Sequence, residues 1–192
     1  NNYLKNISVS NKPFIIYKSL KGFDLYTNFS KKIILTKKNV QNFIEKMDKN
    51  RSKNKNTDLF IGFFGYEILN NLINIKIKKQ KNSNFPKGIF YKPETKIKLS
   101  KKLNYKPCRL IKSSKVFNVN LSKASYNNIF NKFKRKIKSG ETYQIKICTK
   151  YRNKSEIDPL DFFCRLTKSN MAPEAFMIKD KNYSIISCSP EN

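Results

Sequence analysis

Apolar and polar positions alternate in the first part of the chain, which predicts paired strands. The segments "PFIIYKS" and "FDLYTNF" flank the turn-like "LKG", so we expect a hairpin over residues 13–29. Apolar residues then recur at helical spacing: Val40, Phe43, Ile44 and Met47. Thr36 is a candidate N-cap for this helix, and the polar, basic residues 48–57 are expected to form a loop.

The most apolar segment is "LFIGFFGYEILNNL", residues 59–72. We expect a buried strand from Leu59 to Phe64, a break at Gly65 and a short helix from Tyr66. Gly62 and Gly65 indicate either close backbone approach or a tight turn, or they are simply core glycines. Further along, "GIFYKP" and "KIKLSKK" predict two strands joined at Pro93-Glu94.

A second region is predicted to begin near residue 120, which divides the chain into 1–120 and 121–192. Ser122 is a plausible N-cap, and Gly140 lies where a helix would end. Between them an apolar stripe follows helical spacing: Tyr126, Ile129, Phe130, Phe133 and Ile137. The pattern therefore predicts an amphipathic helix.

A strand is predicted next, in "GETYQIKICTKY", residues 140–151. One face is apolar or aromatic: Tyr143, Ile145, Ile147, Thr149 and Tyr151. Gln144 lies on the other face, among lysines. Asp158-Pro159 then predicts a helix start, and "EAFMI" and "YSIISCS" predict a hairpin around "KDKN". Because the chain stops directly after a strand, we expect it to be a piece of a longer protein.

The strong positive charge raises the possibility of nucleic-acid binding. The chain has 192 residues, 41 basic and 13 acidic, for a net charge of +28. However, 5 of the basic residues are Arg, and the lysines are spread along the whole chain. Nucleic-acid recognition favours Arg for bidentate contacts, so a solvated lysine surface is the preferred interpretation. The alternative of a different class is an RNA- or polyanion-binding module that stacks bases on Phe60, Phe63 and Phe64.

The cysteine and histidine content limits the possible chemistry. Cys108, Cys148, Cys164 and Cys188 are far apart, and the sequence has no His. This excludes zinc-ligand spacing and a Cys–His catalytic pair, and it favours reduced thiols in a cytoplasmic protein. A general acid or base would have to be a carboxylate, Lys, Tyr or Cys. No apolar run is long enough for a transmembrane helix, and the first residues lack the apolar core of a secretory signal.

Five segments in order resemble the chorismate-utilising enzymes, which include anthranilate synthase component I, aminodeoxychorismate synthase component I and isochorismate synthase. The segments are "GFFGYEI", "GETYQIKI", "DPLDFFCRL", "SNMAPEAFMI" and "IISCSPEN". The resemblance implies an α+β fold of antiparallel sheets packed face to face with outer helices. It also implies that most of the active site lies beyond Asn192, so that this chain alone would be inactive.

The resemblance assigns roles to two residues of this sequence. Water-adding relatives carry Lys at the position of Gln144, whereas ammonia-using relatives carry Gln, so Gln144 indicates an amine-adding enzyme. Glu191, in Ser-Pro-Glu, would be a general acid or base beside the departing ring hydroxyl. If the resemblance did not hold, Gln144 would be a polar residue on a sheet face and Glu191 a carboxylate without a partner.

The resemblance also implies substrates, a cofactor and a partner. These are chorismate, ammonia from a separate glutamine amidotransferase subunit, and Mg²⁺ whose ligands are expected beyond residue 192. Tyr143-Gln144 favours aminodeoxychorismate synthase component I, in folate biosynthesis, and anthranilate synthase component I is the alternative. Met171 and Glu174 depart from the family loop, and the family's Leu-Leu-Glu-Ser motif is absent from residues 1–58. These departures argue against a tryptophan site.

Overall fold

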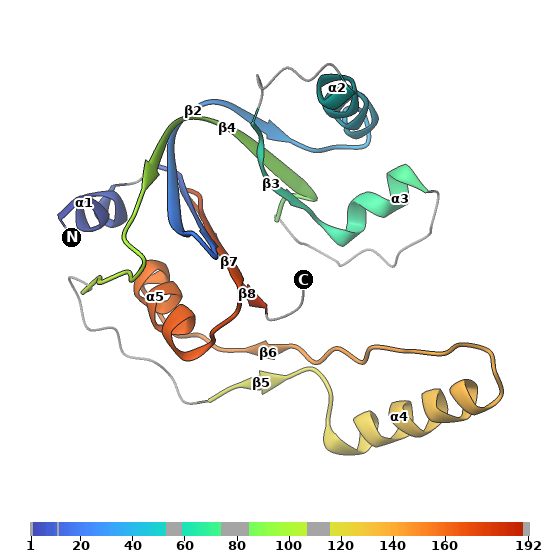
Figure 1. Ribbon diagram of the computed structural model, residues 1–192. Helices are drawn as coiled ribbons and strands as arrows, with labels where there is room; N and C mark the ends of the chain where they lie inside the picture. The colour runs from blue at the N-terminus through green and yellow to red at the C-terminus, as the bar shows by residue number, and fades with distance from the viewer. Residues whose placement is uncertain (1, 11, 53–58, 74–84, 107–115, 190–192) are drawn as a thin grey trace. The chain divides into compact units, whose positions relative to one another are not determined.

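The computed structural model describes residues 2–10, 12–52, 59–73, 85–106 and 116–189 (Figure 1). It is an α+β structure with an antiparallel sheet, which confirms the predicted fold class. The chain forms two compact units. Unit 1 comprises Asn1–Pro107 and Pro159–Asn192, and unit 2 comprises Cys108–Asp158. The division of the family fold at residue 120 stays a prediction.

Unit 1 is built on one antiparallel sheet with the strand order β3-β4-β2-β1-β7-β8. Its strands are β1 (Phe14–Ser19), β2 (Gly22–Ile34), β3 (Ile61–Phe64), β4 (Gly88–Lys98), β7 (Glu174–Lys179) and β8 (Ser184–Ser189). Its helices are α1 (Asn2–Val9), α2 (Val40–Ser52), the 3₁₀-helix η1 (Tyr66–Ile68), α3 (Leu69–Leu72) and α5 (Pro159–Ser169). Both predicted hairpins, β1–β2 and β7–β8, are confirmed. Strand β1 joins them, because it pairs with β2 on one side and with β7 on the other.

Three apolar cores hold unit 1 together. The α5 core contains buried residues of α1, β1, β2, α5 and β7: Leu4, Phe14, Ile16, Phe23, Leu25, Leu160, Phe163, Cys164, Ala175 and Met177, with Leu103. The Tyr91 core contains Ile15, Tyr26, Ile89, Tyr91 and Ile178. The α2 core contains Leu35, Val40, Phe43 and Ile68. Alternating residues of β1 enter the α5 core and the Tyr91 core, so both faces of the central strand are covered.

The predicted break at Pro93-Glu94 is wrong, because β4 runs through both residues as a single strand. Pro93 lies opposite Phe29 of β2, and the register between the two strands shifts directly beyond this pair. Proline has no N–H to give to a ladder, so it is tolerated at such an irregularity. On β2 the irregularity follows Asn28, whose φ of 51° is left-handed. The chain therefore bends here without turning back.

The apolar segment near residue 60 forms an edge strand, which corrects the prediction of a buried strand from Leu59. Strand β3 begins at Ile61, and Leu59 is 54% exposed. Close backbone approach is confirmed at both glycines: a Cβ at Gly62 would lie 1.9 Å from the Ile89 carbonyl oxygen, and one at Gly65 would lie 2.6 Å from that of Lys87. The glycines let β3 approach β4 closely. The short helical turn from Tyr66 is also confirmed.

Helix α2 occurs where the apolar spacing predicts it, but it continues to Ser52, so the loop predicted over residues 48–57 is wrong for 48–52. The rest of that predicted loop, residues 53–57, lies outside the described residues. The side chain that closes the turn before α2 is Asn39, whose Oδ1 accepts from the backbone N–H of Thr36 at 2.7 Å. Helix α1 was not predicted by the sequence pattern.

Unit 2 contains β5 (Asn118–Val119), α4 (Lys123–Lys138) and β6 (Tyr151–Arg152). Both predicted ends of α4 are confirmed. The Ser122 side chain accepts from the Ser125 backbone N–H at 3.1 Å, and Gly140 has a φ of 75°. Past the helix the Glu141 N–H donates to the Lys136 carbonyl, which is typical of a glycine-terminated helix.

The strand predicted over residues 143–151 is wrong for most of its length. Within the part of the chain that the structure describes, residues 143–150 belong to no sheet, and β6 contains Tyr151 and Arg152. β6 pairs with β5, which is two residues long. A strand needs a neighbour to satisfy its backbone groups, and this short partner reaches only the end of the segment.

Candidate functional site

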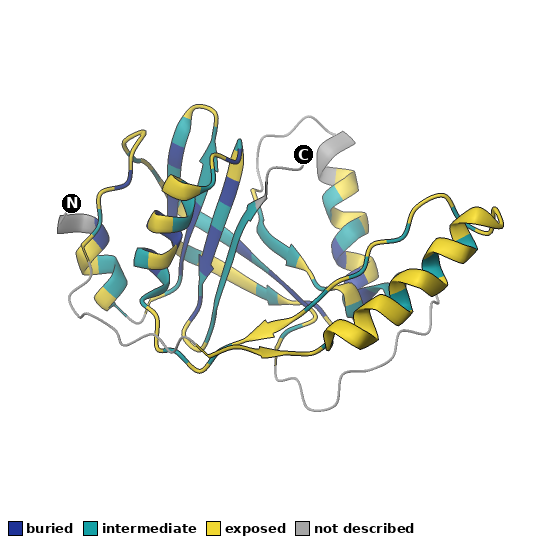
Figure 2. Cartoon of the chain, turned by 90° about the horizontal axis from the view of Figure 1, so that it is seen from below, coloured by how far each residue is buried: buried dark blue, intermediate teal, exposed yellow. Residues whose placement is uncertain are grey.

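Gln144 lies on the extended segment of unit 2 that follows α4. After the turn at Gly140 the chain runs back alongside α4 (Figures 1 and 2). The Gln144 side chain is exposed, and its backbone carbonyl accepts from the Thr142 hydroxyl at 3.2 Å. The carboxamide is therefore accessible to a ligand and is not consumed by packing.

Glu191, the second predicted site residue, lies outside the described residues. The strand that leads to it is described: β8 pairs with β7, with Ala175 opposite Cys188 and Glu174 opposite Ser189. The β7–β8 hairpin therefore carries the chain to Ser-Pro-Glu. Gln144 belongs to unit 2 and β8 to unit 1.

The loop between α5 and β7, which contains Met171 and leads to Glu174 at the start of β7, is held by polar contacts. Asn170 Nδ2 donates to the Cys188 carbonyl at 2.8 Å, which ties the end of α5 to β8. Lys18 Nζ donates to the Ala172 carbonyl at 2.7 Å, which ties the loop to β1. Met171 projects into solvent. The loop thus has fixed anchors on both strands that flank β7.

Glu174 accepts a hydrogen bond from the Tyr17 hydroxyl. This hydrogen bond, followed by partial burial, raises the pKa of Tyr17 to about 12. The resemblance implies an aromatic residue at the position of Glu174, whereas here a carboxylate joins β7 to β1. The sequence indicates the departure at Glu174 but not its contact with Tyr17. No local sequence pattern predicts a contact between two residues so far apart in the chain.

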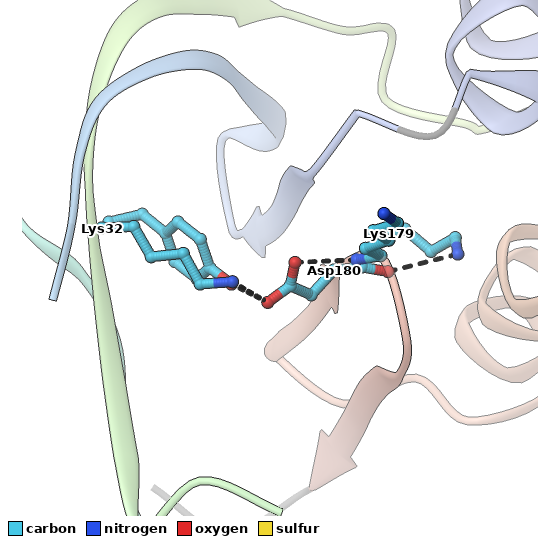
Figure 3. Close-up of polar contacts among 5 residues, drawn as sticks. Lys32, Lys179 and Asp180 are labelled. Carbon is cyan, nitrogen blue, oxygen red and sulfur yellow. Dashed lines mark hydrogen bonds and ion pairs between the residues drawn. The ribbon is translucent and has the colours of Figure 1, made fainter. Parts of the chain in front are cut away.

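Asp180, directly after β7, is the centre of a polar cluster that the sequence did not indicate (Figure 3). Its Oδ2 accepts from Lys32 Nζ and from the Tyr91 hydroxyl, both at 2.6 Å. Its Oδ1 accepts from the Lys181 backbone N–H at 2.7 Å. Lys32 lies near the end of β2 and Tyr91 near the start of β4. The cluster therefore ties the β7–β8 turn to both of these strands.

The surroundings of Asp180 favour its ionised form. Burial alone would raise its pKa, but the hydrogen bonds from Lys32, Tyr91 and the Lys181 N–H outweigh burial and lower the pKa to about 2. For Tyr91, burial and the hydrogen bond to Asp180 raise the pKa. Asp180 therefore stays negatively charged near neutral pH and neutralises Lys32. Its fixed protonation state fits a structural anchor for the hairpin better than a general acid or base.

The described residues include no group of three or more His, Cys, Asp or Glu side chains that could hold a metal ion. They therefore do not fit a magnesium site, and the magnesium ligands expected beyond residue 192 stay a prediction. Cys148, Cys164 and Cys188 do not form disulfide bonds with one another. Among the described helices, none is both long and apolar enough to cross a membrane.

The chain matches known proteins over most of its length. The family model described as "chorismate binding enzyme" matches residues 12–192. The chain is 26% identical over 185 residues to anthranilate synthase component 1 of Buchnera aphidicola subsp. Diuraphis noxia, covering 78% of this chain and 35% of that relative. It is 32% identical over 116 residues to the protein of the same name from Buchnera aphidicola subsp. Rhopalosiphum maidis, covering 58% of this chain and 22% of the relative. The chain thus spans about a third or less of these relatives, and it belongs to the chorismate binding enzyme family.

Proposed function

We propose that this chain is part of an enzyme that adds ammonia to chorismate. The observation that carries the proposal is the exposed carboxamide of Gln144. The resemblance implies that water-adding chorismate-utilising enzymes carry Lys at this position. A lysine amine can take a proton from water. A carboxamide does not titrate near neutral pH, so it can orient a ligand but cannot generate hydroxide. Ammonia is itself a nucleophile and needs no such base.

Glu191 is the proposed acid or base for the ring hydroxyl that departs. A carboxyl group in a partly dry cleft has a raised pKa, which lets it give a proton to a leaving oxygen. The contribution of unit 1 is to hold the strand that precedes Glu191. Asp180 anchors the turn of the β7–β8 hairpin, and Asn170 anchors β8 near its end.

The proposed product is 4-amino-4-deoxychorismate, a precursor in folate biosynthesis. Tyr143-Gln144 and the absence of Leu-Leu-Glu-Ser from residues 1–58 support this product. Anthranilate is the second candidate, supported by the relatives, which are named anthranilate synthase component 1. The proposed enzyme would receive ammonia from a glutamine amidotransferase subunit and use Mg²⁺ bound by residues outside this chain.

The alternative of an RNA-binding module is less well supported. It needs Phe60, Phe63 and Phe64 as open stacking platforms, but each ring contacts another ring of the chain. The centroid distances are 5.8 Å from Phe60 to Phe43, 5.5 Å from Phe63 to Phe85 and 4.8 Å from Phe64 to Phe90. These three rings therefore pack against other rings of the chain around β3.

The chain covers 35% of the Diuraphis noxia relative. The reaction is therefore tested in a chimera in which that relative supplies the rest of the sequence. This chain would replace the matched segment of that relative, and the purified chimera would receive chorismate, ammonium and Mg²⁺. Anthranilate would be detected by fluorescence, and aminodeoxychorismate by adding a lyase that converts it to p-aminobenzoate. Formation of either amine supports amination, and the product identifies the enzyme.

The role of Gln144 is tested in the same chimera. We expect Gln144→Lys to lower the rate of amination by about tenfold or more and to yield isochorismate, since an amine can activate water. Cys148→Lys is the matched control, because it adds the same side chain at another exposed position of the segment. The proposal is refuted if Gln144→Lys aminates chorismate as fast as the control does.

A further inference from the structure

A cavity in unit 1 lies between the end of α1 and the first two strands of the sheet. Its volume is about 300 Å³, which is within the range of small-molecule binding sites. Among the described residues that line it, four are apolar: Ile7, Pro13, Phe14 and Phe29. Mostly apolar walls favour a ligand with an apolar body, and the polar groups beside them decide which ligand fits.

The walls of the cavity are held by contacts that do not depend on a ligand. Phe14 is 1% exposed and belongs to the α5 core. The ring of Phe29 packs against the ring of Tyr91, with 4.9 Å between the centroids. The Ser10 backbone N–H donates to the Asn6 carbonyl at 3.1 Å, which holds the end of α1. Because the walls are already in place, a ligand would order little of the protein when it binds.

Thr27 of β2 lines the cavity and carries a hydroxyl group without a partner. The residue is 8% exposed, and its Oγ1 is closed to solvent and has no hydrogen-bond partner among the described residues. Thr95, opposite it on β4, instead accepts a hydrogen bond from Asn28 Nδ2 at 3.1 Å. A buried hydroxyl without a partner is unfavourable, and proteins usually satisfy such a group. Rotation about χ1, for which strands offer two common values, would let a ligand in the cavity supply the partner.

Lys12 gives the cavity its charge. Among the described residues that line the cavity, Lys12 alone is charged, and its side chain is exposed. No ion pair involves Lys12 in the described part of the chain. An exposed ammonium group beside an apolar cavity attracts an anion whose charged end stays near water while its apolar body enters.

We propose that this cavity binds a small aromatic carboxylate that carries a hydroxyl group on its ring. The ring would lie against Phe14 and Phe29, since aromatic pairs gain from edge and offset contacts. The carboxylate would face Lys12, and the ring hydroxyl would bond to Thr27. The inference goes beyond the proposed function, because its residues belong to α1, β1, β2 and the turn before β1, and binding is measured without chorismate.

The test uses the whole 192-residue chain and three probes of similar size. The first, 4-hydroxyphenylacetate, has the ring, the carboxylate and the hydroxyl. Phenylacetate lacks the ring hydroxyl, and 2-(4-hydroxyphenyl)ethanol lacks the charge. Each is titrated while NMR follows the backbone amides. We expect 4-hydroxyphenylacetate to bind with a Kd below about 1 mM and to shift amides of residues 7–14 and 27–29. Each of the other two should bind about threefold or more weakly, because one polar contact is lost.

Two variants assign the polar contacts. Thr27→Val removes the hydroxyl and keeps the shape, so it should weaken 4-hydroxyphenylacetate by about threefold or more and leave phenylacetate unchanged. Its urea midpoint should not fall, because the lost hydroxyl has no partner in the unliganded chain. Lys12→Gln should weaken both carboxylates by about threefold or more and leave the alcohol unchanged. Lys37→Gln is the matched control, because it removes an exposed charge outside the cavity and should bind all three probes as the unmodified chain does.

The outcomes separate this inference from the proposed reaction. If 4-hydroxyphenylacetate shifts no amide of residues 7–14 and 27–29 at about 10 mM, the cavity holds water only and the inference is overturned. It is also overturned if the alcohol binds as tightly as 4-hydroxyphenylacetate, or if Thr27→Val and Lys12→Gln bind as the control does. Binding with the expected order of probes supports the site even when the chimera leaves chorismate unchanged, in which case the proposed reaction alone fails.

Discussion

Replacing Asp180 with Asn removes the charge at the centre of the polar cluster while keeping the shape of the side chain. Lys32 Nζ and the Tyr91 hydroxyl both lie 2.6 Å from Oδ2. Asp180 is 6% exposed, so water screens these contacts weakly. The amide of the variant cannot neutralise Lys32, and one of its two polar atoms is a donor facing other donors.

The expected loss follows from the lowered pKa. The surroundings lower the pKa of Asp180 from 3.8 to about 2. Each pKa unit corresponds to about 1.4 kcal/mol, so ionised Asp180 contributes about 2 kcal/mol to the free energy of unfolding. A fully buried ion pair would lose about 3–5 kcal/mol when broken. The Lys32 side chain is 43% exposed and can rehydrate, so the smaller value applies.

The assay is urea unfolding of Asp180→Asn and the unmodified chain, followed by circular dichroism. A lowered pKa gives stability that is present above the ordinary pKa and is lost as pH falls through the folded-state pKa. The difference of about 2 kcal/mol should therefore be complete at neutral pH and should disappear between about pH 4 and pH 2. Glu94→Gln is the control, because it removes the same charge from an exposed position and should change stability by less than about 0.5 kcal/mol.

Two outcomes would refute this reasoning. If Asp180→Asn matched the unmodified chain at neutral pH, the cluster would not stabilise the fold. If the difference persisted unchanged at pH 2, it would come from altered packing and not from the carboxylate charge.

Three further substitutions test the backbone at Gly62 and Gly140 and the hydrogen bond between Glu174 and Tyr17. Gly62→Ala should destabilise unit 1 by about 2 kcal/mol or more in urea unfolding, since its Cβ would lie 1.9 Å from the Ile89 carbonyl oxygen. Gly140→Ala, at a φ of 75° with open space around the added Cβ, should cost about 1 kcal/mol, and equal losses would contradict the steric argument. Glu174→Gln should lower the pKa of Tyr17 from about 12 towards its ordinary value of 10.0, as measured by NMR of labelled tyrosines. In the unmodified chain this tyrosine stabilises the fold below pH 10 and ceases to do so as pH rises through about 12, and an unchanged Tyr17 pKa in the variant would exclude Glu174 as the cause.

Elements with strong local signals were predicted correctly. The ends of α4 follow from Ser122 and Gly140, whose capping roles depend on neighbouring backbone groups alone. The β1–β2 and β7–β8 hairpins follow from alternating residues around short polar turns. The motifs that carry the family resemblance are local as well, and the match over residues 12–192 confirms the family.

Strand limits were predicted less well, because they depend on partners elsewhere in the chain. Pro93 and Glu94 resemble a turn locally, yet they continue β4 because β2 lies alongside with a register shift. Residues 143–150 have the pattern of a strand, yet in the described part of the chain they have no strand to pair with. Periodicity shows which side of a segment is apolar, and pairing decides whether the segment joins a sheet.

For the candidate site, the sequence by itself determined the family and the uncharged side chain at Gln144. The tertiary structure alone showed that Asp180 binds Lys32 and Tyr91, and that Glu174 binds Tyr17. These pairs join residues that are far apart in the sequence, so no local pattern of residues encodes them. Local sequence fixes backbone preferences and side-chain chemistry, whereas contacts between distant residues arise when burial of the apolar cores brings their strands together.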